Sequence, residues 1–304
     1  MPGVRKVLGE GRSLRPLWGG RIEVNSRQDH QRAAAGLAEL LMYSLGARAL
    51  SRLGQARAVQ AVERHAARAL LRRLAATLDM DGLHHARAGG PYVVAALHEG
   101  FLDVPLLLHL PLDLTFVARD ELFGWPVLGQ HLRECGHIAV SPERGASGYR
   151  RLLTAARERA RRGSSIALFP QGSILGVETA LNPGAIALAR TLELPLLPVA
   201  ITGTHRAWEH PFTPRLRYGE RLSLRVLEPL TTEELTEGSL ESLRLDLSRR
   251  LKEAALSGDM APPRRYRPER DGYWDRYAFE IDPFFPEVAR AIAERRQEVE
   301  VRAA

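Results

Sequence analysis

Apolar and polar positions follow two different rhythms along the chain. From residue 31 to about residue 79, Leu and Met recur at roughly helical spacing among Ala and Arg, and no proline interrupts them. These residue types favour helix by intrinsic propensity, and a break near Gly54 predicts two successive helices. After Gly90 the pattern changes to short β-rich runs separated by helical stretches.

The second rhythm predicts an α/β domain. Strands are expected at 92–97, 114–118, 137–140, 165–169 and 196–201, with a further strand, placed at the edge of the sheet, at 221–227. Helices are expected between them at 102–110, 121–134, 147–162 and 184–193, and later near 238–256 and up to about 297. Strands that alternate with helices favour a mixed, largely parallel sheet with helices on both faces.

These patterns divide the chain into four parts. We expect a flexible arm over 1–29, a helical membrane-surface segment over 30–80, an α/β domain over 81–235, and a C-terminal helix with an aromatic and proline-rich tail over 236–304. The arm lacks the apolar core of a secretory signal. The best apolar stretch is interrupted by Glu39 and Arg48, so no segment reaches the roughly 20 apolar residues of a bilayer-spanning helix.

The net charge of the chain favours some classes of binding partner over others. The chain has 43 Lys and Arg against 36 Asp and Glu, a net charge of +7, and nearly all of its basic residues are Arg. The guanidinium group binds phosphate through a planar fork of donors, which favours a phosphate-bearing partner such as an anionic lipid. Aromatic residues make up 6% of the chain and do not interleave with the basic run, so no nucleic-acid partner is expected.

Arg outnumbers acidic residues in the segment 30–80, and two interpretations stay open for it. A basic amphipathic helix lies in the headgroup plane of an anionic membrane. An ordinary helical hairpin packs on the core and keeps a solvated Arg face. Cys135 is the single cysteine of the chain, which excludes an internal disulfide, and we interpret it as a packed, unreactive thiol.

The stretch AALHEGFLDVPL (95–106) places ionisable residues inside an apolar run. His98 follows a predicted strand, and reactive groups gather at the carboxyl ends of strands in open α/β sheets. A turn at Gly100 would bring the Asp103 carboxylate to one imidazole nitrogen, fix the tautomer and leave the other nitrogen as a general base. The alternative is a capped turn with Asp103 at a helix start. The second His of a zinc-protease motif is missing, so no metal is expected.

Four blocks in the expected order resemble the glycerolipid acyltransferase family, whose best-known members are the 1-acyl-glycerol-3-phosphate acyltransferases. HEGFLD (98–103) matches the family's His-x4-Asp signature, and the second block is ARDELFGWPVLGQHLRECGHIAV (118–140). FPQGS (169–173) is similar to the Phe-Pro-Glu-Gly-Thr block, and LPLLPVAITGT (194–204) to the final strand. The resemblance covers roughly residues 80 to 230.

The resemblance implies transfer of an acyl group from acyl-CoA or acyl-carrier protein to a hydroxyl of a lipid acceptor such as 1-acyl-glycerol-3-phosphate, in phospholipid biosynthesis and without a cofactor. His98 would be the general base and Asp103 its orienting partner, with backbone N–H groups after Gly100 stabilising the oxyanion. The resemblance also implies a location: the protein would be a peripheral protein on the cytoplasmic face of a membrane. The sequence leaves the oligomeric state open.

In the family, the second and third blocks bind the phosphate of the acceptor. By this resemblance the expected substrate-binding residues are Arg119, Arg144, Pro170, Gln171, Gly172 and Ser173.

The sequence departs from the family pattern at four points, one of which is Ser173 in place of the motif's Thr. Leu97 stands where Asn usually precedes the His, Gln171 replaces Glu, and Ile174 replaces a phosphate-binding Arg. These changes make an amino-acid lipid or a glycolipid an alternative acceptor. A non-catalytic lipid-binding protein with the same fold, and a thioesterase that uses water, are the competing functions.

Overall fold

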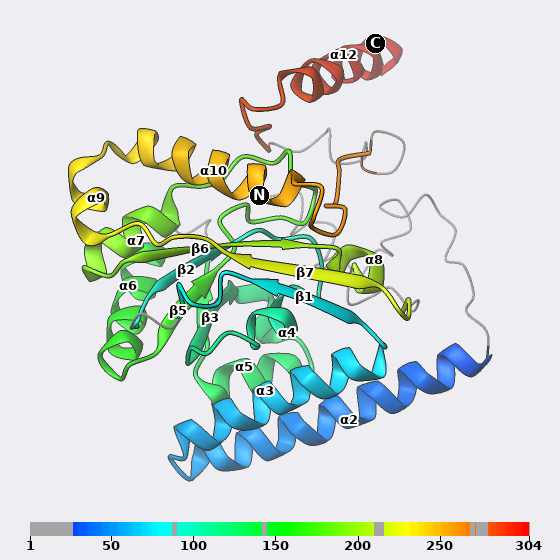
Figure 1. Ribbon diagram of the computed structural model, residues 1–304, viewed down its shortest axis with the longest axis vertical. Coiled ribbons are helices and arrows are strands. Elements are labelled where there is room, and N and C mark those ends of the chain that lie inside the picture. Colours follow the sequence, from blue (N-terminus) through cyan, green and yellow to red (C-terminus); the bar gives the residue numbers. More distant parts are fainter. Residues whose placement is uncertain are drawn as a thin grey trace.

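The structure is a computed structural model, and it describes residues 27–86, 90–141, 145–209, 216–267, 271 and 279–303. In this part of the chain a seven-stranded sheet has the order β1-β7-β6-β2-β5-β3-β4 (Figure 1). Its strands are β1 (Thr77–Asp81), β2 (Val93–Ala96), β3 (Leu114–Arg119), β4 (Ile138–Val140), β5 (Ser165–Leu168), β6 (Leu196–Thr202) and β7 (Arg221–Val226). All neighbouring strands run parallel except β6 and β7, which are antiparallel. The predicted mixed, largely parallel sheet is confirmed.

Helices cover both faces of the sheet. They are α2 (Arg27–Arg52), α3 (Ala56–Arg73), α4 (Asp103–Leu107), α5 (Leu128–Cys135), α6 (Gly145–Arg161), α7 (Gly184–Leu192), α8 (Thr204–Trp208), α9 (Thr232–Glu237), α10 (Leu240–Leu256) and α12 (Pro286–Ala303). Figure 1 shows α2 and α3 side by side below the sheet and α10 above it. The predicted pair of N-terminal helices is confirmed, with Gly54 at φ +71° in the turn between them.

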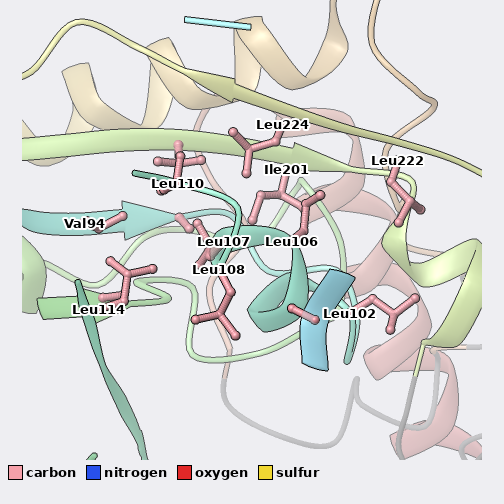
Figure 2. Close-up of a cluster of buried hydrophobic side chains, with 14 of the residues drawn as sticks. Val94, Leu102, Leu106, Leu107, Leu108, Leu110, Leu114, Ile201, Leu222 and Leu224 are labelled. Atoms are coloured by element: carbon pink, nitrogen blue, oxygen red, sulfur yellow. The ribbon is translucent and has the colours of Figure 1, made fainter. Parts of the chain in front are cut away.

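The central strands separate two apolar cores. Val94 and Ala96 of β2 face the core that contains α3 and α4, whereas Val93 and Ala95 face the core that contains α6, α7 and α10. Figure 2 shows the first core, where Leu106 of α4 lies among side chains of the sheet. Burial on both faces explains why these strands are continuous apolar runs.

Three sequence predictions at the level of elements were wrong. The segment predicted to be helical over 30–80 leaves the helix after Arg73, the last residue of α3, and its last residues belong to β1. The strand predicted at the edge, β7, lies between β1 and β6, and β1 is at the edge instead. β1 has the sequence TLDMD and is only partly buried, so it lacked an apolar run that would have marked it as a strand. The helix predicted over 121–134 is a 3-10 turn, η1 (Asp120–Gly124), followed by α5. Pro126 lies between the two and cannot continue a helix.

The predicted arm over 1–29 lies outside the described residues up to position 26, and α2 already begins at Arg27. Among the described helices, none is both long and apolar enough to cross a membrane.

The packing of α4 gives the first prediction. Leu106 is fully buried in the core beneath the first motif, and replacing it with Ala leaves a cavity. Leu106→Ala should lower the free energy of unfolding by about 2–5 kcal/mol, measured by urea denaturation. Leu245→Ala on α10, where the side chain is 40% exposed, is the matched control and should change the free energy by less than about 1 kcal/mol. Equal effects of the two substitutions would contradict the assignment of the core.

Candidate active site

The carboxyl end of β2 and the start of α4 bring His98 and Asp103 together. The imidazole Nδ1 of His98 lies 2.6 Å from Oδ2 of Asp103, and the Asp103 side chain is completely buried. The backbone N–H groups of Glu99 and Gly100 donate to the same oxygen, at 2.7 and 3.0 Å. Asp103 therefore satisfies both interpretations of the motif at once, because it caps the turn and binds the imidazole.

Close packing of α8 against this turn explains the glycine at position 100. A Cβ atom on Gly100 would lie 3.0 Å from the carbonyl oxygen of Trp208 and 3.1 Å from the amide nitrogen of His205. The approach brings the hydroxyl of Thr204, the first residue of α8, to Oδ1 of Asp103, to which it donates a hydrogen bond. Both oxygens of the buried carboxylate are thus bound, which offsets the cost of removing the charge from water.

The contact with Asp103 determines the tautomer of His98. Because Nδ1 faces a carboxylate oxygen, it carries the hydrogen and donates it, so Nε2 is left as a base. Nε2 has no hydrogen-bond partner among the described residues, and the His98 side chain is 25% exposed. The ring is stacked on Phe169, with centroids 4.1 Å apart and an interplanar angle of 15°, which fixes its plane. Such a pair can accept a proton from a hydroxyl group.

Gln171 of the third motif holds His98 from the other side. Its Oε1 accepts a hydrogen bond from the His98 backbone N–H at 2.7 Å, and its Nε2 donates to the carbonyl oxygen of Gly176 at 2.8 Å. The side chain is 2% exposed. Both polar ends of Gln171 are therefore bound within the protein, and its contact with a substrate stays a prediction.

His98 borders a large cavity of about 1820 Å³. Most of the lining is apolar and comes from α2, α3, β3, α5 and the segment after β5. Phe169, Pro170, Gln171 and Gly172 line it next to His98, so the third motif forms part of the wall. Ligand pockets of drug-sized molecules are commonly about 300–1,000 Å³, and this cavity has room for a longer apolar ligand.

The remaining predicted substrate-binding residues differ in position. Arg119 also lines the cavity, and its Nε forms an ion pair with Glu121 at 2.9 Å. Ser173 has a buried hydroxyl without a hydrogen-bond partner among the described residues. Arg144 lies outside the described residues.

The role of backbone N–H groups after Gly100 in stabilising an oxyanion stays a prediction, although three amides at this turn are already engaged. The amides of Glu99 and Gly100 donate to Asp103, and the amide of Phe101 donates to the carbonyl oxygen of Trp208 at 3.1 Å. These donors are used to hold the turn and the carboxylate, so they are not available to a ligand.

Glu99 is a buried residue of the site that sequence reasoning did not assign. Its Oε1 accepts from the Arg264 amide at 2.7 Å, and its Oε2 faces the Gly203 amide at 2.8 Å and Nδ1 of His205 at 3.0 Å. Burial, together with the adjacent charge of Asp103, raises the pKa of Glu99 well above its ordinary value. Burial also lowers the pKa of His205 to about 4. The only sequence signal for Glu99 was a second acidic residue inside an apolar motif.

A second polar cluster lies on the wall of the cavity. Oε1 of Glu63 is 3.0 Å from Nε2 of His131 and 3.2 Å from Nε2 of His137, and their ligand atoms lie close enough together to hold a metal ion. The amide of Phe116, however, donates to Nδ1 of His137 at 3.2 Å. The hydrogen of His137 is therefore on Nε2, which makes this nitrogen a donor to Glu63 rather than a metal ligand.

Hydrogen bonds to the two histidines keep the Glu63 carboxyl group ionised despite its burial. Burial alone would raise the pKa of Glu63, but the hydrogen bonds from His131 and His137 outweigh it and lower the pKa to about 2. Burial raises the pKa of the neighbouring Cys135 thiol to about 12, which agrees with the interpretation of Cys135 as unreactive.

The comparisons with known proteins agree with this geometry. Residues 77–202 match the protein family described as Acyltransferase. The 1-acyl-sn-glycerol-3-phosphate acyltransferase of Limnanthes alba is 26% identical over 54% of this chain and 58% of its own length. The lyso-ornithine lipid O-acyltransferase of Pseudomonas aeruginosa is 29% identical over 58% of this chain and 72% of its own length. The chain thus spans little more than half the length of the first of these relatives.

A solved structure shows the same fold. The crystal structure of the 1-acyl-sn-glycerophosphate acyltransferase of Thermotoga maritima superposes with a TM-score of 0.55 and 20% identity, over 73% of this chain and 95% of that chain.

The Glu63 cluster gives a prediction of pH dependence. The carboxyl has a pKa of about 2 in the folded protein, below the value of about 4.3 in an unfolded chain. Its stabilisation is therefore complete above the unfolded pKa and is lost as the pH falls toward the folded one. Glu63→Gln should cost up to about 3 kcal/mol of unfolding free energy near pH 7. In urea denaturation the difference from wild type should shrink from about pH 5 downward, and a difference independent of pH would contradict this.

Proposed function

From the match of residues 77–202 to the Acyltransferase family, we propose that the chain transfers a fatty acyl group from an acyl thioester to a hydroxyl of a lipid acceptor. The observation that carries the proposal is the His98–Asp103 pair, which presents one imidazole nitrogen beside a large apolar cavity. The acyl donor is acyl-CoA or acyl-carrier protein, because each carries its acyl chain as a thioester. No further cofactor takes part in the proposed reaction.

His98 and Asp103 can perform the proton transfers of the reaction. Nε2 of His98 takes the proton of the acceptor hydroxyl as its oxygen attacks the thioester carbonyl, and Asp103 stabilises the resulting imidazolium. The tetrahedral intermediate then collapses, the carbon–sulfur bond breaks, and the departing thiolate receives the proton from His98. The products are an ester and a free thiol, and no bond to the enzyme forms.

The cavity supports a lipid substrate rather than a small polar one. Its apolar lining buries a hydrocarbon chain with a gain of about 0.8 kcal/mol per methylene group. The same lining limits access of water to the thioester, which favours transfer to an alcohol over hydrolysis.

Two classes of acceptor fit the family. The first is 1-acyl-glycerol-3-phosphate, the acceptor named for the Limnanthes alba relative and for the solved structure. The second is a lipid without a phosphate, such as an amino-acid lipid, and two observations favour it. Ile174 stands where the family motif has Arg, and the Arg119 guanidinium is engaged by the Glu121 carboxylate. A phosphate would therefore meet less positive charge here than the motif normally supplies.

We also propose that the protein binds a membrane surface through α2. Exposed apolar side chains lie along this helix at Leu41, Met42 and Leu45, and Val127 near α5 is exposed as well. Leu41 and Val127 also line the cavity, so a lipid chain would enter it from the side that faces the bilayer.

The basic residues of the N-terminal helices contribute less to this proposal than their number suggested. Their ion pairs with the protein's own carboxylates are Arg48 and Arg52 with Glu134, Arg64 with Asp113, and Arg73 with Glu39. An arginine that is paired within the protein is less available to a lipid phosphate. Apolar contact is therefore the larger contribution that we expect to membrane binding.

The central experiment replaces the two paired side chains. His98→Ala should lower the turnover of a thioester and lysolipid pair by about 10²–10⁴-fold, because it removes the general base. Asp103→Asn should lower it by a comparable factor, because it disturbs the tautomer and removes the charge that stabilises the imidazolium. Acceptor-dependent release of free thiol measures both.

Circular dichroism controls for folding of these variants. Retention of more than about a tenth of the wild-type rate by folded His98→Ala would contradict the assigned role. Thiol release without any acceptor would instead indicate a thioesterase, and wild-type protein that releases no thiol with any lysolipid would indicate a non-catalytic lipid-binding protein.

The choice of acceptor is tested by restoring the missing charge. Ile174→Arg should raise kcat/KM for 1-acyl-glycerol-3-phosphate about tenfold relative to a phosphate-free lysolipid, as one charge-assisted hydrogen bond supplies. The two acceptors are compared in the same thiol-release assay. An unchanged ratio would show that position 174 does not face the headgroup.

Membrane binding is tested by placing charges on α2. Met42→Asp combined with Leu45→Asp should reduce co-sedimentation with anionic phospholipid vesicles by about tenfold or more, because two apolar anchors are lost. Leu245→Asp on α10 is the control and should bind like wild type. Vesicle binding that is equally strong in all of these variants would rule out the α2 face.

A further inference from the structure

A segment near the C-terminus crosses the candidate active site. Residues 260–267, which we call the C-terminal strap, lie beyond residues 77–202 that match the family. The strap contacts β7 through a hydrogen bond from the Ala261 amide to the Ser223 hydroxyl at 2.9 Å. It contacts the segment after β5 through the Tyr266 amide, which donates to Oε2 of Glu178 at 2.9 Å. Arg264, at the centre of the strap, is 6% exposed.

The main chain of Arg264 joins two of the motifs. Its amide donates to Oε1 of Glu99, in the first motif, at 2.7 Å. Its carbonyl oxygen accepts from the amide of Val177, just after the third motif, at 2.9 Å.

The guanidinium group of Arg264 is bound on all sides within the protein. Nε donates to Glu209 at 2.9 Å, and one terminal nitrogen donates to Asp271 at 2.6 Å. The other terminal nitrogen donates to the carbonyl oxygen of Leu175. Because the planar fork of an arginine matches these separate acceptors at fixed angles, the side chain holds them in one arrangement.

These contacts lead to His98 through a short relay. Arg264 binds Leu175 and Val177, which flank Gly176 on either side. The carbonyl oxygen of Gly176 accepts from Gln171, and Gln171 in turn accepts from the amide of His98. Arg264 is therefore connected to the backbone of His98 through Gln171, and to its neighbour Glu99 directly.

The strap and the loop after the third motif touch backbone to backbone. Gly176 has φ +136°, and a Cβ atom there would lie 2.8 Å from the amide nitrogen of Tyr266 and 3.1 Å from the carbonyl carbon of Arg265. Only glycine fits this contact. Gly176 is an observation independent of the Arg264 hydrogen bonds, and it also indicates that this loop and the strap are built to pack together.

We propose that Arg264 is a positioning residue for the acyl transfer proposed above, acting on His98 through the loop that carries Gln171. It touches neither substrate nor reacting atoms. Residues 260–267 thereby become part of the active-site framework, although they lie outside the part of the chain that matches the family. This proposal rests on the proposed function for its effect on kcat. Its effect on the hydrogen bond of the His98 amide can be measured whether or not the protein is an enzyme.

Two variants test the relay from independent ends. Arg264→Lys keeps a charge between Glu209 and Asp271 but loses the fork. Gly176→Ala removes no charged group and disrupts the contact between loop and strap, where its Cβ would meet the Tyr266 amide and the Glu178 carboxyl group. Each should lower kcat by about 100-fold, as small displacements of a catalytic group do, with KM for the thioester and the lysolipid within about threefold. Arg249→Ala, on the exposed part of α10, is the control and should retain wild-type kcat.

Amide hydrogen exchange gives the readout that does not depend on activity. The His98 amide should be protected in the wild-type protein by its bond to Gln171, and its exchange should be about tenfold faster in both variants. Amides of β5 should exchange as in wild type. If Arg264→Lys does not fold, the kcat and the His98 amide exchange of Gly176→Ala alone test the proposal.

The outcomes separate the two proposals. Folded variants with wild-type kcat, or with unchanged exchange of the His98 amide, would overturn the positioning role, and a lower unfolding temperature alone would show a purely structural one. A wild-type protein without transferase activity would contradict the proposed function, and the exchange measurement would still decide the role of Arg264.

Discussion

The site depends on one buried negative charge, the carboxylate of Asp103. An unpaired charge in such a position is very costly, and four donors compensate it: the imidazole of His98, the amides of Glu99 and Gly100, and the hydroxyl of Thr204. The first three come from the turn after β2, whereas the fourth comes from the turn after β6. Because β2 and β6 pair in parallel, their carboxyl ends meet at one edge of the sheet. The strand order is thus what assembles the pair.

A second buried carboxyl group, that of Glu99, increases the number of hydrogen bonds that the site requires. Glu99 is also buried, and its carboxyl group contacts the amides of Gly203 and Arg264 and Nδ1 of His205, so two further segments must be in place before the motif is satisfied. Leaving a buried donor or acceptor without its partner costs about 1–3 kcal/mol, which ties the stability of the site to segments far from the motif. The same packing therefore holds His98 rigidly and leaves a cavity beside it. Hydrogen bonds fix the imidazole on the side of Asp103, and apolar side chains line the cavity on the other side.

Much of this could be predicted from local sequence and some could not. The central strands are buried on both faces and appear as apolar runs. The five-residue spacing of His98 and Asp103 around a glycine left a simple capped turn as an alternative, and the resemblance to the family motif favoured their contact. The edge strand β1 lacked such a run. Thr204 and Arg264 were missed because they act on partners 101 and 165 residues away, and no local pattern records such a pairing. Gln171 was interpreted as a substrate contact from the family motif, whereas its amide group holds the backbone of His98.

The central claim is that Asp103 fixes His98 with its hydrogen on Nδ1 and leaves Nε2 as the base. The most direct test is two-bond proton–nitrogen NMR correlation on protein labelled with ¹⁵N-histidine, with His98 assigned by comparison with His98→Ala. The account predicts the Nδ1–H tautomer for His98 in the wild-type protein at neutral pH, and loss of that single tautomer in Asp103→Asn. An Nε2–H tautomer in the wild-type protein, or a tautomer unaffected by Asp103→Asn, would contradict it.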